Sequence, residues 1–386
     1  MHARARLTVR RRRDRKRMHA TTTTTTTTTT TRAVTTRDER RTRASGRVTR
    51  GCDRHHHHRG RRDNRGRRGR PRAGASGGGV ATASMRTSFG SASVKGTVRK
   101  QNEDRYSVYS DAQAGDGTPG MILSVFDGHG GDAVSEWLKN KLNGIILEEW
   151  TRADFPLEAL RVACLRADEV LVQPPEGFFA AFGERGVGGS KCGSTAAIVA
   201  LCEEGGSTRL CTANVGDARI LLVRDGKAVQ LSVDHVPDDE AERKRIDRGN
   251  PNLRKSLVTF TEGSWRVGGV LALSRAFGDS FLKESGRFEG IGEKNADYGS
   301  GFGLNAEPDC YIEQITPADS WVLLSSDGLF ENPERGGGGG WTNQEIADYL
   351  LAAPADKDPE TLAKELIQQA VAKGSTDDVT VQLLRL

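Results

Sequence analysis

The fold is decided around residues 125–132, which read Val-Phe-Asp-Gly-His-Gly-Gly-Asp. Residues 121–126 are mostly apolar and partly β-branched, which predicts a buried strand. Residues 133–150 place apolar side chains at three- and four-residue spacing, which predicts an amphipathic helix. Asp127 therefore ends a strand, and Gly128 and His129 follow it. A carboxylate, a carbonyl and an imidazole at a strand end suit a hard divalent cation with an acid or base beside it. An Asp-Gly pair is equally typical of a plain turn.

The charge of the chain is divided between two segments. The 386 residues carry a net charge of +6, but residues 1–75 hold 24 Arg and one Lys against five acidic residues, a charge of +20. The remaining residues carry 32 basic and 46 acidic side chains, a charge of −14. A basic arm is thus joined to an acidic body. The basic isoelectric point describes the arm, so it does not indicate that the body binds nucleic acid.

Cysteine usage and hydropathy exclude several classes of protein. The six Cys show no CxxC pair and no spacing typical of zinc sites, so we expect free thiols in a reducing compartment. No apolar run approaches the roughly 20 residues that a membrane span needs. We therefore expect no transmembrane segment.

Residues 1–85 are predicted to be a disordered basic arm. They contain eleven consecutive Thr, four consecutive His and several Arg runs, with almost no large apolar residue. Such a segment cannot bury enough surface to offset its chain entropy. Its composition fits a chloroplast transit peptide, with a cleavage region near residues 80–83, but it equally fits a nuclear signal or a loose RNA-binding tail of a cytoplasmic or nuclear protein.

The body, residues 86–386, is predicted to form one α+β domain. Residues 281–305 are predicted to be a long loop, and the glycines at 336–340 a flexible insert. Strands outnumber helices, and the helices do not follow each strand, which favours sheet packed on sheet with helices outside. After a short strand that follows Asp104, strands are expected at 121–126, 195–201, 209–215, 220–223, 228–231, 321–326 and 379–384, and helices at 133–150, 157–171, 238–249, from a capping box at 342–345, and between 359 and 374.

Acidic residues recur at the ends of the predicted strands. Glu103-Asp104 precedes one strand, Asp327-Gly328 ends another as Asp127-Gly128 does, and Asp377-Asp378 precedes the last. Carboxylates at the ends of several buried strands can converge on one cleft, and a strong positive charge makes their mutual repulsion tolerable. Oxygen ligands favour Mg²⁺ or Mn²⁺ over zinc.

With these motifs the sequence resembles the type 2C metal-dependent (PPM) serine/threonine protein phosphatases. The matching motifs follow the family's order over about residues 90–386, and they are Arg99 with Asn102-Glu103-Asp104, residues 125–131, Gly193-Ser194-Thr195-Ala196, Val215-Gly216-Asp217-Ala218-Arg219, Asp234-His235-Val236-Pro237, Ser274-Arg275-Ala276-Phe277-Gly278-Asp279, Ala306-Glu307-Pro308-Asp309, Ser326-Asp327-Gly328-Leu329-Phe330 and Gly374-Ser375-Thr376-Asp377-Asp378-Val379.

The resemblance implies a four-layer αββα sandwich, in which two antiparallel sheets pack face to face with helices outside. It also implies a centre of two Mg²⁺ or Mn²⁺ ions. Asp127 matches the carboxylate that bridges both ions, and the carbonyl of Gly128 matches a ligand to one of them. Asp327 and Asp377 match ligands to the other.

The remaining site residues also follow from the resemblance. Glu103 matches the metal acid on the Gly128 side, Asp217 a residue linked to a third, weaker metal, and Asp104 a neighbour that holds metal-bound water. Arg99 matches the phosphate-binding arginine and His129 the general acid. The implied reaction is in-line attack on phosphoserine or phosphothreonine by a water or hydroxide that bridges the two ions.

Two other functions remain open from the sequence. A catalytically weak family member would act as a phosphoprotein-binding or scaffold module, but it would be expected to lack a metal carboxylate or the phosphate arginine. Binding of nucleic acid through the arm is the second, and we expect no specific nucleic acid. The sequence departs from the family pattern at Asp378, where Asn is common, in the longer connection over residues 281–305 and in the glycine insert at 336–340, and we expect function to be retained. We expect a monomer, and the sequence does not identify the substrate phosphoprotein.

Overall fold

Strand β3 (Pro119–Phe126) explains why this sequence forms a sandwich. In the computed structural model, Leu123 and Val125 belong to a core between two sheets, whereas Ile122 and Phe126 belong to a core beneath helices. Successive side chains of a strand point to opposite faces, so a strand with apolar residues on both faces needs cover on both of them. The structure describes residues 87–173, 186–250, 256–261, 263–284, 301–330 and 340–386, all within one compact unit of the chain.

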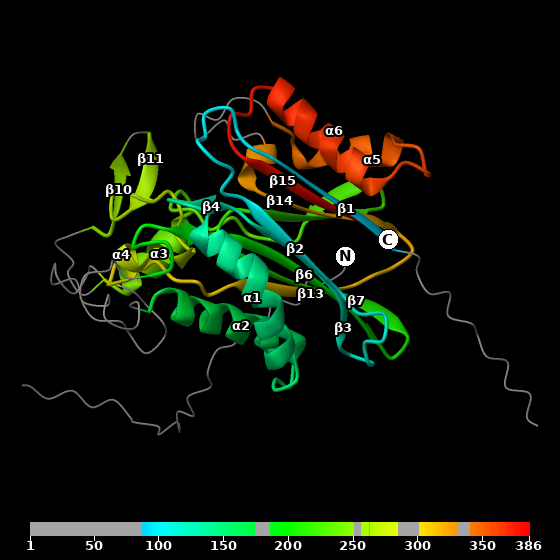
Figure 1. Ribbon diagram of the computed structural model, residues 1–386, viewed down its shortest axis with the longest axis horizontal. Coiled ribbons are helices and arrows are strands. Elements are labelled where there is room, and N and C mark those ends of the chain that lie inside the picture. Colours follow the sequence, from blue (N-terminus) through cyan, green and yellow to red (C-terminus); the bar gives the residue numbers. More distant parts are fainter. Residues whose placement is uncertain (1–86, 174–185, 251–255, 262, 285–300, 331–339) are drawn as a thin grey trace, which may run out of the picture. The chain divides into compact units, whose positions relative to one another are not determined.

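Two five-stranded antiparallel sheets form the middle layers (Figure 1). The first has the order β13-β7-β6-β3-β2 and consists of β2 (Arg105–Ser110), β3, β6 (Ala196–Glu204), β7 (Ser207–Val215) and β13 (Asp309–Gln314). The second has the order β1-β15-β14-β8-β9 and consists of β1 (Ser88–Val94), β8 (Arg219–Arg224), β9 (Lys227–Gln230), β14 (Asp319–Ser325) and β15 (Val379–Arg385). Val199, Leu222 and Val322 are fully buried in the core that the sheets share.

A pair of helices covers the outer face of each sheet (Figure 1). They are α1 (Ala133–Trp150) and α2 (Pro156–Leu171) on the first sheet, and α5 (Asn343–Ala352) and α6 (Pro359–Ala372) on the second. In α1, Leu138, Leu142 and Ile146 are fully buried at four-residue spacing, as in an amphipathic helix. The order of the layers confirms the predicted α+β sandwich.

Smaller elements lie beside the first sheet. A three-stranded sheet of two-residue strands has the order β12-β5-β4, and a separate hairpin pairs β10 with β11. A fourth core, which includes Ile246, Val267 and Leu282, joins the hairpin to two short helices. These elements are β4 (Gly128–His129), β5 (Gly193–Ser194), β10 (Val258–Thr261), β11 (Ser264–Val267), β12 (Phe277–Gly278), α3 (Glu240–Arg248) and α4 (Ser280–Glu284).

Most of the predicted elements are confirmed to within about three residues. The helix predicted at 133–150 has the bounds of α1. The capping box at Thr342 is present, because its side chain accepts from the Glu345 N–H and the Glu345 side chain accepts from the Thr342 N–H. The predicted disorder of residues 1–85 and most of the 336–340 insert lie outside the described residues.

The prediction of a loop over 281–305 is wrong at its beginning. Residues 280–284 form α4, and residues 285–300 lie outside the described part of the chain. Lys283 in α4 pairs with the buried Asp168 of α2, a contact between residues 115 positions apart. The helix therefore depends on a tertiary ion pair that the Gly-rich local sequence does not indicate.

Strand β1 is not predicted from the sequence. Its residues, Ser-Phe-Gly-Ser-Ala-Ser-Val, are small and polar and show little alternation. The strand is defined by pairing with β15 along its whole length. It also packs closely against α6, because a Cβ at Gly90 would overlap with the backbone of Glu360. Such long-range pairing overrides local strand propensity.

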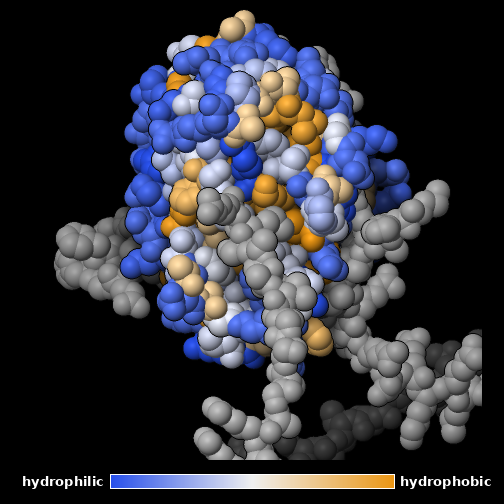
Figure 2. Space-filling model, turned by 90° about the vertical axis from the view of Figure 1, so that its right-hand side faces the viewer, coloured by the Kyte–Doolittle hydropathy of each residue, from blue (hydrophilic) through white to orange (hydrophobic). Residues whose placement is uncertain are grey.

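The face of the molecule in Figure 2 is mostly hydrophilic, and the described cysteines form no disulfide. On the face in Figure 2, hydrophobic residues gather in a few patches among hydrophilic ones, a common pattern on folded proteins. Of the helices in the described part of the chain, none has both the length and the hydrophobicity to cross a membrane. The five described cysteines are free thiols, as predicted, and Cys52 lies outside the described residues.

Candidate metal centre

Three carboxylates from three strand ends come together. Asp127 follows β3, Asp217 follows β7, and Asp327 follows β14 at the start of the short 3₁₀ turn η3 (Asp327–Leu329). One oxygen of each lies within 4.8 Å of an oxygen of the other two. Because β3 and β7 belong to the first sheet and β14 to the second, this aspartate cluster forms where the ends of both sheets meet.

The electrostatics of the aspartate cluster favour a bound cation. Burial raises the pKa of Asp127 well above its ordinary value, and the charges of Asp104, Asp327, Asp217 and Asp377 raise it further. Carboxylates held this close repel one another, and a divalent ion relieves that repulsion. A donor set made only of oxygen atoms is the one that Mg²⁺ and Mn²⁺ prefer. The residues therefore fit a metal centre.

Asp104 supplies further evidence that the residues fit a metal. Its side chain is buried, Ser326 Oγ donates to its Oδ2 at 2.7 Å, and its Oδ1 makes no hydrogen bond within the described part of the chain. Burial raises the pKa of Asp104 to about 7. A buried carboxylate oxygen without a donor is costly unless an ion or an ordered water binds it.

Glu103 and Gly128 lie against each other. A Cβ at Gly128 would overlap with the Glu103 carbonyl oxygen, so only glycine allows this approach. Asp378 fixes the position of Glu103, because its Oδ2 accepts from the Glu103 N–H at 2.8 Å and its Oδ1 accepts from the Gly96 N–H at 2.7 Å. Both oxygens of Asp378 therefore accept backbone donors, whereas the amide of Asn would offer only one acceptor.

Arg99 and Asp377 form a two-point ion pair at the edge of the site. Arg99 Nε donates to Asp377 Oδ1 and Arg99 Nη2 donates to Asp377 Oδ2, both at 2.7 Å. The side chains are 41% and 36% exposed. Asp377 is thus not part of the aspartate cluster, although its charge acts on Asp127. Its role as a metal ligand stays a prediction, as do the roles of Glu103 and Gly128.

His129 pairs with Asp279, a residue for which the sequence predicts no role. Its Nε2 lies 2.8 Å from Oδ2 of Asp279, and the two side chains are 22% and 5% exposed. Burial lowers the pKa of His129, but the charge of Asp279 and its hydrogen bond outweigh burial, so the pKa is raised above 6.5. Asp279 stands in the 274–279 motif, directly after Gly278. That position is the only signal in the sequence for it.

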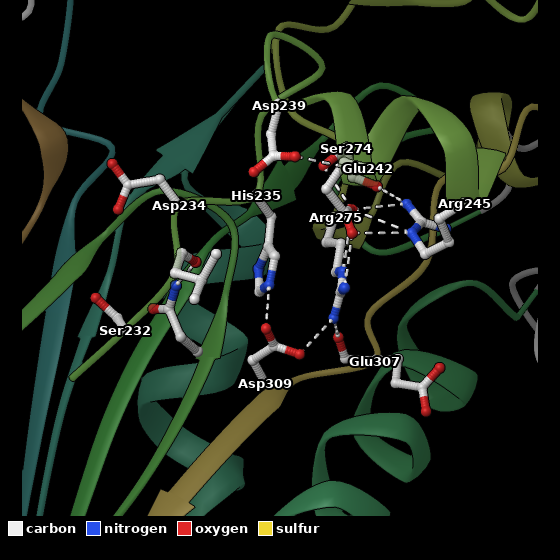
Figure 3. A network of polar contacts seen from close by, with 12 residues as sticks. Ser232, Asp234, His235, Asp239, Glu242, Arg245, Ser274, Arg275, Glu307 and Asp309 are labelled. Atoms are coloured by element: carbon white, nitrogen blue, oxygen red, sulfur yellow. Dashed lines mark hydrogen bonds and ion pairs between the residues drawn. The ribbon is translucent and has the colours of Figure 1, made fainter. Parts of the chain in front are cut away.

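A polar network, here called the Glu242 network (Glu242, Arg245, Ser274, Arg275, Asp309 and His235), supports the segment that leads to β12 (Figure 3). Glu242 of α3 accepts from Arg275 Nη2 at 2.7 Å and from Arg245 Nη2 at 3.0 Å. Arg275 Nη1 also lies 3.4 Å from Oδ1 of Asp309 in β13, and His235 Nε2 lies 3.6 Å from its Oδ2. The network joins α3, β13 and the residues that precede Asp279.

A second, more deeply buried contact holds the same segment. Lys283 Nζ lies 2.7 Å from each carboxylate oxygen of Asp168, and the two side chains are 7% and 0% exposed. Lys283 also donates to the Ala276 carbonyl at 2.8 Å. Asp168 accepts from the Gly278 N–H at 2.8 Å. Helix α2 thereby fixes both sides of β12.

Comparison with known proteins identifies the family of the chain and supports its fold. The family model for protein phosphatase 2C matches residues 89–379. Probable protein phosphatase 2C 45 of Oryza sativa subsp. japonica is 32% identical over 310 residues, which cover 80% of this chain and 91% of the relative. Probable protein phosphatase 2C 20 of Arabidopsis thaliana is 34% identical over 291 residues, which cover 74% and 81%.

Solved structures show the same fold at lower identity. The crystal structure of serine-threonine phosphatase 2C from Toxoplasma gondii has a TM-score of 0.57 and 21% identity, and it covers 77% of this chain and 94% of that one. The match of the family model and the extent of the curated relatives lead to one conclusion. The chain belongs to the protein phosphatase 2C family and is a metal-dependent protein serine/threonine phosphatase.

Proposed function

We propose that the domain at residues 86–386 hydrolyses phosphoserine and phosphothreonine in proteins with two divalent ions, Mg²⁺ or Mn²⁺, and that it acts as a monomer. The observation that carries the proposal is the aspartate cluster, whose three carboxylates approach within 4.8 Å. The scaffold alternative is not favoured, because the predicted metal carboxylates and the arginine are all present.

The metal ligands come from the cluster and its neighbours. Asp127 and Asp327 are the central ligands, the Gly128 carbonyl and Glu103 extend the site on one side, and Asp377 extends it on the other. Asp217 suits a weaker third ion. When bound, two divalent ions supply a nucleophilic water of lowered pKa and neutralise charge on the phosphoryl group.

Arg99 suits the task of binding the phosphate. It already engages Asp377 through two parallel N–H donors, and a phosphate offers oxygens at the same spacing. Its side chain is 41% exposed, so a substrate can reach it. Exchange of the Asp377 carboxylate for a substrate phosphate would hold the phosphorus in line for attack.

His129 and Asp104 suit proton transfer around the phosphate. The seryl or threonyl oxygen needs a proton as the P–O bond breaks, and His129 lies two residues from Asp127 with a raised pKa. The unpaired Oδ1 of Asp104 can accept a hydrogen bond from the attacking water. With these two roles, each site residue predicted from the sequence has a proposed function in the reaction.

The proposal is tested by removing one carboxylate at a time. Asp127→Ala and Asp327→Ala should each lower kcat on a phosphothreonine peptide with Mn²⁺ by at least 10²-fold, as expected when a metal-based nucleophile is lost. Calorimetry should show weaker Mn²⁺ binding, and circular dichroism should show an intact fold. Asp356→Ala, at an exposed position between α5 and α6, is the matched control. Near-wild-type activity of Asp127→Ala would refute the assignment.

A further inference from the structure

The three-stranded sheet β12-β5-β4 places Asp279 next to His129. Its middle strand pairs Gly193 with His129 on one side and with Gly278 on the other. Asp279 follows Gly278 directly, so its carboxylate lies over the middle strand. There its Oδ2 meets His129 Nε2 at 2.8 Å. The three strands are each only two residues long, yet they bring together residues 150 positions apart in the sequence.

Gly193 provides the space in which this pair forms. A Cβ at this position would overlap with both His129 Nε2 and Asp279 Oδ2. The backbone of Gly193 does not require glycine, because it is not among the residues with positive φ. Glycine is therefore needed at position 193 to leave room for the contact between His129 and Asp279, and not for the conformation of the strand.

The backbone of Asp279 is held in a costly conformation. Its φ is +50°, and Asp225, in the turn between β8 and β9, is the one other non-glycine residue with positive φ in the described part of the chain. This left-handed region is unfavourable for residues other than glycine, although Asp and Asn enter it most readily. The Asp279 N–H donates to the Cys192 carbonyl, and its own carbonyl accepts from Leu282 N. Hydrogen bonds on both sides thus hold the carboxylate in place.

We propose that Asp279 is a positioning residue for catalysis, which fixes the His129 ring and keeps a proton on Nε2, so that Nδ1 serves as the acid for the leaving group. A carboxylate can only accept, so Nε2 must donate to it. This inference rests on the proposed role of His129 as general acid. As the P–O bond breaks, its electron pair goes to the seryl or threonyl oxygen, and that oxygen takes the Nδ1 proton of the imidazolium, which leaves a neutral ring with its proton on Nε2. The neutral imidazole regains a proton from solvent.

The test uses two variants that tolerate the backbone conformation of Asp279. Asp279→Gly removes the carboxylate, and Asp279→Asn keeps a neutral acceptor of the same shape. The substrates are a phosphothreonine peptide, whose leaving oxygen needs a proton, and p-nitrophenyl phosphate, whose phenolate leaves without one. Asp279→Gly should lower kcat on the peptide by about 10²-fold, with a loss on p-nitrophenyl phosphate at least about tenfold smaller and little change in KM. Asp279→Asn should fall between Asp279→Gly and the wild type.

A His129→Ala control separates the two claims. If His129→Ala loses equal activity on both substrates, the general-acid role fails, and the positioning role fails with it. If His129→Ala discriminates between the substrates but Asp279→Gly does not, only the positioning role fails. Equal losses of Asp279→Gly on both substrates would likewise identify Asp279 as merely structural.

A second readout needs no turnover. Long-range ¹H–¹⁵N correlation spectra of the full chain, labelled at histidine and recorded at a pH at which the His129 ring is neutral, distinguish the two ring tautomers. His129 should carry its proton on Nε2 in the wild type and show a mixture in Asp279→Gly. His235 is an internal reference, since its Nδ1 accepts from the Gly216 N–H and its tautomer should not change. A wild-type His129 protonated on Nδ1 instead would overturn the inference.

Discussion

Replacement of Lys283 by Met is expected to destabilise the fold strongly. The change removes the cation from a pair whose side chains are 7% and 0% exposed, and it leaves the Asp168 carboxylate buried. Breaking such a pair from one side costs about 3–5 kcal/mol. Asp168 keeps the Gly278 N–H as a donor, so the lower end, about 3 kcal/mol, is expected. For a domain of this size, that loss corresponds to a fall in Tm of roughly 6–10 °C.

Urea unfolding of the full chain measures this loss. The midpoint should shift to lower urea with an unchanged slope, which is the sign of altered stability rather than an altered unfolded state. Lys364→Met is the matched control, because Lys364 pairs with Glu360 on the surface of α6 and such pairs contribute little. The double variant Asp168→Leu with Lys283→Met should recover part of the loss, since no charge stays buried. A Lys283→Met protein within about 1 kcal/mol of wild type would refute the reasoning.

Four further substitutions test other parts of the site. Burial opposes ionisation of Glu242, but its ion pair with Arg275 outweighs burial and lowers its pKa below 4.5. The stability that ionised Glu242 contributes is therefore fully present above pH 4.5 and is lost as the pH falls. In urea unfolding, the difference in stability between wild type and Glu242→Gln should become smaller below that pH. Gly193→Ala should lower kcat on the phosphopeptide without unfolding the protein, because the added Cβ occupies the space of the His129–Asp279 contact. Wild-type kinetics in this variant would show that the reaction does not depend on that space. Asp378→Asn should weaken Mn²⁺ binding by about tenfold in calorimetry, since it removes one acceptor that positions Glu103. Arg99→Ala should raise KM for the phosphopeptide without weakening Mn²⁺ binding; a loss of Mn²⁺ affinity would mean that Arg99 supports the metal centre instead.

Periodicity accounts for the parts of the fold that the sequence predicts well. The bounds of α1 follow from apolar residues at three- and four-residue spacing, and β3 follows from an apolar run. Asp127 and Asp327 are identifiable as candidate metal ligands because each follows the end of such a run. Their proximity to Asp217 depends on how the two sheets pack against each other. The local sequence pattern does not predict that packing, whereas the family resemblance implies it.

Elements without a period could not be predicted in this way. The strands β4, β5 and β12 have two residues each, too few to show alternation. The pairs that fix this region, His129 with Asp279 and Asp168 with Lys283, join residues 150 and 115 positions apart. These partners are set by tertiary contact, and a single Asp in the sequence does not indicate which cation or imidazole it will contact.

The aspartate cluster takes its carboxylates from the ends of both sheets, so an ion bound there also fastens one sheet to the other. Global unfolding must then release the ion, and each tenfold rise in free ion above its dissociation constant adds about 1.4 kcal/mol to stability. The lifetime of the folded enzyme in a cell would then depend on the supply of the divalent ion that the cluster binds. A shortage of this ion would therefore lower the amount of folded protein as well as its activity.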